Sequence, residues 1–203
     1  MILSNIFLKY MLIPTTFLLA FSLNALNYME IKTFSKEGFL QMVVEIPAGT
    51  NQKIEYDEYL NDFFIDKIDG VDRVINFLPY PGNYGFIPST KMDKERGGDG
   101  DSLDILLISE SIDTGTVLNV IPIALLVLQD SNEIDTKIIA IPAEENLRII
   151  NAINYSDLNK DYLALQNIIK LWFINYKGNG IVKFIKWSDE TNAKSEINKW
   201  SLK

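Results

Sequence analysis

Short runs of apolar and β-branched residues, separated by turn-rich segments, fill the middle of the chain. Three of these runs predict strands at Leu40–Ile46, Val117–Leu128 and Lys137–Ile141, and Pro142 ends the last one. A fourth run, Ile105–Ile108, follows directly after a cluster of aspartates. The intervening segments are rich in Gly, Pro, Asn and Asp, so they predict loops that carry most of the chemically interesting side chains.

The spacing of apolar residues changes to a helical period from Ser156 onward. Large apolar side chains recur there every three or four residues, which predicts one long helix with Ser156 as its cap and Gly178 at its end. A shorter helix is predicted from Asp189 to about Trp200. Several short strands followed by helices predict an α+β fold, in which a small closed or half-closed β-barrel has helices packed outside it.

The N-terminus is unlike the rest of the chain, because Tyr10–Leu23 is almost wholly apolar and uncharged. An apolar run of about 14 residues behind a single lysine predicts a signal peptide over residues 1–25, and therefore a periplasmic or secreted protein. The run is short for a membrane span, which needs roughly 20 residues, but Ile6–Leu8 lengthen it, so a membrane anchor is the alternative. A true start at Met11 or Met29 would instead predict a cytoplasmic protein.

Composition limits the chemistry that the chain can perform. With 203 residues and 47% apolar composition, it is long enough for one buried core, so we expect a single domain over residues 26–203. A formal net charge of -8 argues against a protein that binds nucleic acid by general attraction. The absence of Cys and His excludes disulfides, thiolate nucleophiles, His-based triads and ordinary structural zinc sites. Catalysis must then use carboxylates, Lys, Arg, Tyr or a metal ion.

The strongest chemical signal is Asp99-Gly-Asp101-Ser-Leu-Asp104, which places three carboxylates close together where a glycine-rich loop enters a predicted strand. Hard oxygen ligands at this spacing predict a site for Mg²⁺, Mn²⁺ or Ca²⁺. Calcium motifs fit poorly. If Asp99 is position 1 of an EF-hand loop, Asp104 falls at position 6, where that loop requires glycine. A calcium-binding β-helix needs repeated copies of its motif, and this chain has a single partial copy. A solvated acidic turn without a metal is disfavoured, since like charges repel unless a cation offsets them.

Other charged residues are weak evidence when each is taken alone. Asp130 and Asp135 lie in a predicted loop at Gln129–Thr136, and the plain interpretation of this pair is a polar hairpin turn. Glu45 interrupts an apolar strand, so it needs a partner or a metal if it faces inward, and otherwise lies on the wet face of an edge strand. Basic residues and tyrosines in the other loops suit phosphate oxygens, while carboxylates suit metals.

In chain order, these blocks resemble the family I soluble inorganic pyrophosphatases over roughly Leu40–Trp187. The blocks are Glu45-Ile-Pro, Lys53-x-Glu55, Val-Asp-Arg73, Tyr80-Pro-x-Asn-Tyr84-Gly, the Asp99–Asp104 cluster, Asp130-x-x-x-x-Asp135-x-Lys137 and Tyr176-Lys177. A match to any one block is weak, but a chance match to all of them in this order is very improbable.

The resemblance implies a five-stranded OB-like β-barrel flanked by C-terminal helices, and hydrolysis of pyrophosphate to two phosphates with several Mg²⁺ ions, Mn²⁺ being possible. It implies that Asp101 is the general base that takes the proton of the attacking water. The implied metal ligands are Asp99, Asp104 and Asp135 for the first metal, Asp104 also for a second, and Asp130 and Glu45 for metals arriving with substrate. The implied phosphate-binding residues are Lys53, Arg73, Tyr84, Lys137, Tyr176 and Lys177, supported by Glu55 and Tyr80.

Two positions beside the implied site depart from the family pattern. Ser102 stands where Pro is usual, and Gly82 stands where Cys or another residue is frequent. We expect Ser102 to loosen its loop slightly, since a serine restores the freedom that a proline removes. The family implies a homo-oligomer, a hexamer in bacterial members, but without His the chain lacks side chains that such members can use between subunits.

The alternative function is a non-catalytic calcium- or phosphate-binding module on the same scaffold. The retention of Asp101 together with every implied cation favours the enzyme, because a pure binding protein needs no general base.

Overall fold

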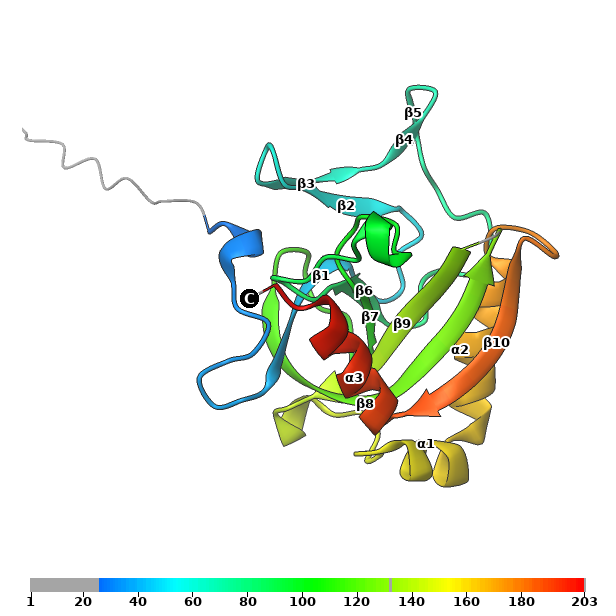
Figure 1. Ribbon diagram of the computed structural model, residues 1–203. Coiled ribbons are helices and arrows are strands. Elements are labelled where there is room, and N and C mark those ends of the chain that lie inside the picture. The colour runs from blue at the N-terminus through cyan, green and yellow to red at the C-terminus, as the bar shows by residue number, and fades with distance from the viewer. Residues whose placement is uncertain (1–25, 132, 203) are drawn as a thin grey trace, which may run out of the picture.

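The computed structural model describes residues 26–131 and 133–202 (Figure 1). The predicted signal peptide or anchor at residues 1–25 lies outside this part of the chain. Among the residues described, no helix has the length and apolar character needed to cross a membrane.

The core is a six-stranded sheet in which five strands form a closed ring of pairings. Around the ring, β1 (Leu40–Ile46) pairs with β6 (Asn83–Phe86), β6 with β7 (Asp104–Leu107), β7 with β9 (Glu133–Pro142), β9 with β8 (Val117–Asp130), and β8 with β1. The pairing of β7 with β9 is parallel, and the others are antiparallel. The sixth strand, β10 (Val182–Asp189), pairs with β8. The closed five-stranded arrangement with accompanying helices confirms the predicted α+β fold.

The long helix predicted from Ser156 to Gly178 is wrong as a single element. The structure has two helices, α1 (Tyr155–Asp161) and α2 (Leu163–Asn175), separated at Tyr162, whose φ of -130° and ψ of 33° are not helical. The cap of α1 is Asn154, whose side chain accepts a hydrogen bond from Asp157 N at 2.9 Å. The apolar period continues through the break, which explains why the pattern concealed it.

The shorter helix predicted from Asp189 to about Trp200 is confirmed. Helix α3 spans Glu190–Trp200, and the Asp189 carboxylate caps it by accepting a hydrogen bond from Asn192 N at 2.9 Å. Helix α3 packs against β8 and β10, while α2 packs against β10 (Figure 1).

The predicted loop at Gln129–Thr136 is instead mostly strand. Strand β8 continues to Asp130 and β9 begins at Glu133, so the polar residues at the end of this hairpin are paired, with Leu128 opposite Asp135. Turn-forming side chains mark the hairpin correctly, but backbone pairing extends through them as far as Asp130 opposite Glu133.

Two small hairpins stand outside the main sheet, and local helical turns complete the fold. The hairpins are β2 (Ile54–Asp57) with β3 (Asp62–Ile65), and β4 (Lys67–Ile68) with β5 (Val71–Asp72). The 3-10 turns are η1 (Tyr28–Glu30), η2 (Lys94–Arg96) and η3 (Glu145–Leu147). Both hairpins project from the same side of the sheet (Figure 1).

Apolar side chains are buried on both faces of the sheet. Along β7, Leu106 belongs to a cluster with Trp172 and Phe173 of α2, while Leu107 belongs to a second cluster with Ile197 of α3. Alternation along a strand sends successive side chains to opposite faces, so each face is covered by a different helix. The sheet is therefore a rigid base on which the loops at one edge are fixed.

Gly85 provides a test of this close packing. A methyl group at Gly85 in β6 would lie 1.9 Å from the Val43 carbonyl oxygen, whereas Gly38, at φ +85°, has nothing within 4 Å of the same position. We expect Gly85→Ala to lower the free energy of unfolding by about 3 kcal/mol, because β1 must move, and Gly38→Ala by about 1 kcal/mol. Urea unfolding measures both, and equal losses would contradict a backbone contact between β1 and β6 that only glycine permits.

Candidate active site

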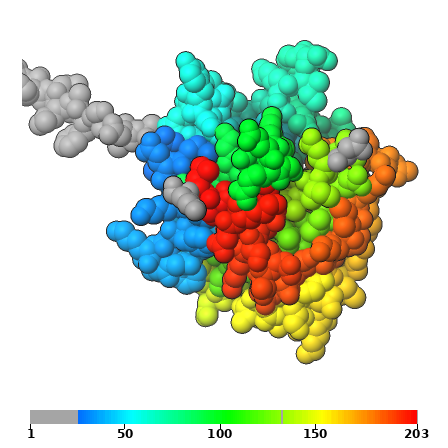
Figure 2. Space-filling model, viewed as in Figure 1, coloured from blue at the N-terminus to red at the C-terminus, as the bar shows by residue number. Residues whose placement is uncertain are grey.

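Two adjoining pockets lie between the β2–β3 hairpin and the first residues of β7 and β9. In Figure 2, the cyan hairpins and the green segment around residue 100 stand on the same side of the molecule. The acidic pocket, of about 230 Å³, contains Glu45 and Asp101. The lysine pocket, of about 550 Å³, contains Lys137 and Lys177. The residues that line both pockets are Lys53, Glu55, Asp99 and Asp104.

All but one of the predicted site residues line these pockets. The acidic pocket adds Glu45 and Asp101 to the shared residues, and the lysine pocket adds Arg73, Tyr84, Asp130, Asp135, Lys137, Tyr176 and Lys177. The exception is Tyr80, which is buried behind Tyr84 with 5.4 Å between ring centroids and lies 4.5 Å from Trp172. The structure therefore brings together residues that are far apart in the sequence, with Tyr80 as packing behind them.

Glu45 faces inward from β1 and is only 8% exposed, so its placement on the wet face of an edge strand is ruled out. Its Oε1 accepts a hydrogen bond from Tyr56 N at 2.9 Å. Burial raises the pKa of Glu45 to about 7, although the nearby Lys53 ammonium acts in the opposite direction. Lys53 itself contacts Glu55 at 3.0 Å. The acidic pocket thus holds a carboxylate whose negative charge is costly without a further cation.

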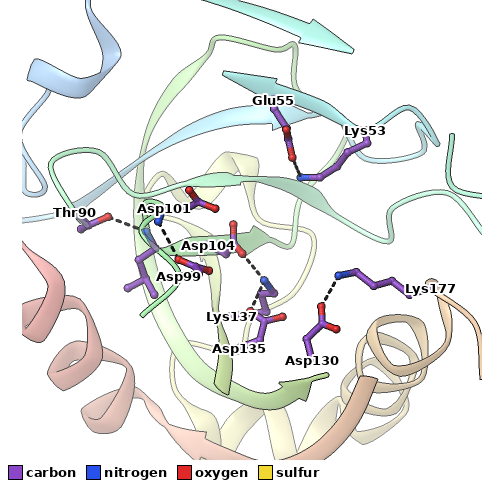
Figure 3. Close-up of polar contacts among 11 residues, drawn as sticks. Lys53, Glu55, Thr90, Asp99, Asp101, Asp104, Asp130, Asp135, Lys137 and Lys177 are labelled. Carbon is purple, nitrogen blue, oxygen red and sulfur yellow. Dashed lines mark hydrogen bonds and ion pairs between the residues drawn. The ribbon is translucent and has the colours of Figure 1, made fainter. Parts of the chain in front are cut away.

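The Asp99–Asp104 loop directs its acids into the pockets (Figure 3). The Asp99 Oδ1 accepts a hydrogen bond from Asp101 N at 2.9 Å, which fixes the turn between them. Burial, and then the charges of Asp99 and Asp104, raise the pKa of Asp101. Like charges therefore oppose one another at the position where a hard cation was predicted.

Thr90 supports this loop from behind. Its hydroxyl accepts a hydrogen bond from Leu103 N at 2.9 Å (Figure 3). Its carbonyl oxygen accepts one from the Ser102 hydroxyl at 3.2 Å. The expected loosening at Ser102 is therefore offset by a side-chain hydrogen bond that a proline could not make.

Lys137 lies between two carboxylates at the starts of neighbouring strands. Its ammonium contacts Asp104 of β7 and lies 2.6 Å from Asp135 of β9 (Figure 3). The side chain is 5% exposed, and burial alone would lower its pKa, but the two carboxylates outweigh that effect and raise it. Lys137 is therefore a permanently protonated cation in the lysine pocket, beside Asp104, which lines both pockets.

The other cations of the lysine pocket come from different parts of the fold. Lys177, just beyond α2, contacts Asp130, and Arg73 Nη1 lies 2.9 Å from Asp66 Oδ2. Tyr84 lies among the cations, with the Lys137 ammonium 5.7 Å from its ring centroid. These groups present ammonium, guanidinium and hydroxyl donors toward one space, which suits an anion rich in oxygen atoms.

Asp66 and Asn83 are among the residues near the site to which the sequence pattern assigned no role. Asp66 holds Arg73 through its side chain, and its carbonyl oxygen accepts a hydrogen bond from Arg73 N at 2.7 Å. Asn83, inside a quoted motif, is fully buried and accepts hydrogen bonds from Ala48 N at 2.9 Å and Ile112 N at 2.8 Å. Asn83 could have been identified because it lies inside the Tyr80-Pro-x-Asn-Tyr84-Gly motif. Asp66 lies in no motif, and its sequence shows only an acid a few residues before Arg73.

A metal would fit the donor set, although it would change the present contacts. Within residues 26–131 and 133–202, no three carboxylates are already gathered as a metal-binding group, and Asp104 and Asp135 each contact Lys137 instead. The acidic pocket is lined by the carboxylates of Glu45, Asp99, Asp101 and Asp104, whose oxygen atoms are the donors that Mg²⁺ prefers. Burial, and then the charges of Asp99 and Asp104, raise the pKa of Asp101, and a divalent cation would relieve the repulsion among these charges.

Comparisons with known proteins agree with this arrangement. Residues 42–203 match the family Inorganic pyrophosphatase. An inorganic pyrophosphatase of Sulfolobus acidocaldarius is 36% identical over 78% of this chain and 87% of its own length, and one of Neisseria meningitidis is 35% identical over 79% and 85%.

Solved structures give the same result. A type I inorganic pyrophosphatase of Toxoplasma gondii superposes with a TM-score of 0.77 at 26% identity, covering 86% of this chain and 84% of that one. The enzyme of Thermus thermophilus gives a TM-score of 0.71 at 31% identity, covering 85% and 95%. The family model matches well over half of the chain and the two curated relatives are at least 30% identical over most of it, so the chain belongs to the inorganic pyrophosphatase family.

Proposed function

We propose that this chain hydrolyses inorganic pyrophosphate to two phosphates in a Mg²⁺-dependent reaction. The observation that carries this proposal is the shared boundary of the two pockets, where Asp99 and Asp104 line both an acidic space and a space with several cations. Such a pair of adjoining pockets suits pyrophosphate hydrolysis, because the acidic pocket can bind hard cations and the lysine pocket can bind phosphoryl groups.

The acids are assigned to metal binding. Asp99, Asp104 and Asp135 would hold the first metal, Asp104 would also contribute to a second, and Asp130 and Glu45 would hold metals that accompany the substrate. Mg²⁺, or Mn²⁺ in its place, supplies a lowered pKa for bound water and offsets charge on phosphoryl oxygens. For Asp104 and Asp135 this role requires the Lys137 ammonium to turn toward the substrate, which its flexible four-carbon chain permits.

Asp101 is the general base. Its carboxylate accepts one proton from water as the water oxygen forms a bond to phosphorus, and the bridging oxygen leaves with the electron pair of the broken bond on the second phosphate. The phosphates are bound by Lys53, Arg73, Tyr84, Lys137, Tyr176 and Lys177. Glu55 orients Lys53, to which it is paired, and Tyr80 supports Tyr84.

The alternative of a non-catalytic calcium- or phosphate-binding module is not favoured. The curated relatives compared above are named as inorganic pyrophosphatases, and a protein that only binds needs no general base at Asp101. A phosphate-release assay separates the two functions, because a binding module would retain pyrophosphate without cleaving it.

We also infer that residues 1–25 direct export, with a membrane anchor as the alternative, and that the domain over residues 26–203 acts outside the cytoplasm. The support is the apolar, uncharged Tyr10–Leu23 segment. Mass spectrometry of the protein from cell fractions is expected to find a new N-terminus near Ala25 in the exported fraction. A cytoplasmic protein beginning at Met11 or Met29 would contradict export. A homo-oligomer, and a hexamer in particular, stays a prediction.

The reaction and its base are tested together by Asp101→Asn. We expect the wild-type chain to release phosphate from pyrophosphate with Mg²⁺ and to stop when the metal is chelated. In Asp101→Asn, kcat should fall by about 10²–10⁴-fold, because the amide cannot accept the proton, while folding and Mg²⁺ binding persist. Colorimetric phosphate release and calorimetric Mg²⁺ titration measure these effects.

The matched control is Asp161→Asn, at the exposed end of α1, which lines neither pocket and should retain wild-type turnover. Full activity in Asp101→Asn would refute the role of Asp101. Absence of Mg²⁺-dependent phosphate release by the wild type would refute the proposed reaction itself.

Glu45 is expected to cost stability in the metal-free protein. Its folded pKa of about 7 lies above the ordinary 4.5, so the folded state binds the proton more tightly and stability falls as pH rises between these values. At pH 8, the free energy of unfolding of Glu45→Gln should therefore exceed that of the wild type by up to about 3 kcal/mol, and this difference should shrink toward pH 5. Its turnover should fall, because an amide is a weaker metal ligand.

Urea unfolding of metal-free protein across this pH range measures the effect. Glu37→Gln, at an exposed position, provides the control for loss of one negative charge. If both variants followed the same pH course, the buried charge of Glu45 would not be the cause.

A further inference from the structure

A short segment upstream of the residues that match the family forms part of the acidic pocket. We call Asn27–Thr33 the N-terminal brace. It contains η1, which Asn27 caps by accepting a hydrogen bond from Met29 N at 3.1 Å. The Met29 side chain lines the acidic pocket together with Glu45 and Asp101. The match to the family model covers residues 42–203, and the brace precedes it and contains none of the motif blocks by which the chain resembles the family.

Tyr28 joins the brace to the β2–β3 hairpin. Its ring lies edge-on to Tyr56 and Phe63, with centroids 5.3 and 5.0 Å away, and those two rings are themselves 5.2 Å apart. The Tyr56 backbone N–H is the donor to Glu45, and Glu55 is its neighbour in β2. Aromatic groups in edge-to-face contact hold a preferred geometry, so Tyr28 fixes the strand that forms one wall of the pocket.

Ser89 joins the brace to the segment that lies behind the opposite wall. Its hydroxyl donates to the Ile31 carbonyl oxygen at 2.7 Å and lies 3.2 Å from that of Met29, and the Thr33 hydroxyl donates to the Pro88 carbonyl oxygen at 3.0 Å. Ser89 has a φ of +51°, which residues other than glycine rarely adopt. These hydrogen bonds to the brace help to hold a strained conformation that would otherwise relax.

The residues that follow Ser89 hold the Asp99–Asp104 loop through hydrogen bonds. Thr90 binds Leu103 and Ser102, as described above, and Met92 N donates to the Asp101 carbonyl oxygen at 2.8 Å. Displacement at Ser89 is therefore passed through consecutive residues to the loop that holds Asp101.

We propose that the N-terminal brace is a positioning element of the catalytic centre. It contacts the β2–β3 hairpin through Tyr28 and the support of the Asp99–Asp104 loop through Ser89. It thereby sets the separation of the two walls of the acidic pocket and the affinity of that pocket for Mg²⁺. This inference rests on the proposed Mg²⁺-dependent function.

Two variants of the full chain break the brace at opposite ends. Tyr28→Ala removes the ring that contacts the hairpin. Ser89→Gly removes the hydroxyl and also relieves the positive-φ strain, so its effects do not arise from added backbone strain. We expect each to weaken Mg²⁺ binding by about tenfold, as measured by calorimetry without pyrophosphate, and to raise the Mg²⁺ concentration for half-maximal turnover similarly.

Two further variants serve as controls. Tyr28→Phe keeps the ring contacts and should restore Mg²⁺ affinity to within about twofold of wild type. Tyr59→Ala removes a tyrosine that is 95% exposed at the tip of the same hairpin, and should bind Mg²⁺ as the wild type does.

Unchanged Mg²⁺ affinity in Ser89→Gly and Tyr28→Ala, with only a lower melting temperature, would overturn the proposal and leave the brace a purely structural element. If Tyr28→Ala fails to fold, Ser89→Gly decides the question alone. Because Mg²⁺ binding is measured without substrate, a wild type that binds Mg²⁺ but cleaves no pyrophosphate would refute the proposed function while still testing the brace. A wild type that binds no Mg²⁺ would overturn both.

Discussion

The parallel pairing of β7 with β9 is the constraint on which the site depends. Ile105 lies opposite Ile138 in this register, so the preceding residues, Asp104 and Lys137, are also neighbours. Alternation then places Asp135 on the same face as Lys137. Parallel strands need a long connection, and here β8 supplies it while pairing with both β9 and β1. The same β7–β9 pairing therefore closes the ring of strands and brings Asp104, Asp135 and Lys137 together.

The same arrangement explains why the site tolerates so many carboxylates before any cation arrives. Lys137 is buried between Asp104 and Asp135, and Lys53 lies near Glu45, so two lysines offset part of the acidic charge. Desolvation still raises the pKa of Glu45, which shows that this compensation is incomplete. A site that is underneutralised when empty has a thermodynamic reason to take up divalent cations, and it accepts a loss of stability for that function.

The sequence predicted which residues gather in the pockets better than it predicted the connections between elements. Apolar runs identified β1 at its observed limits, and nearly every site residue that the motifs predicted lines the pockets. Local periodicity could not reveal the break at Tyr162, because the apolar face of α1 continues into α2. It also could not assign Asp66 or Tyr28, whose roles come from contacts with Arg73, Tyr56 and Phe63 rather than from any pattern around them. Contacts of this kind depend on tertiary packing, which periodicity does not encode.

The elements that carry the site differ in how firmly they are held. The acids of β7 and β9 belong to strands paired on both sides, whereas Lys53 and Glu55 belong to the start of a two-stranded hairpin outside the main sheet. A hairpin of two strands has little stability of its own, so its position must come from what it contacts. The contacts of β2 are the Glu45 carboxylate and a cluster of aromatic rings that includes Tyr28. Precision in the acidic pocket therefore depends on packing outside the sheet as much as on the sheet itself.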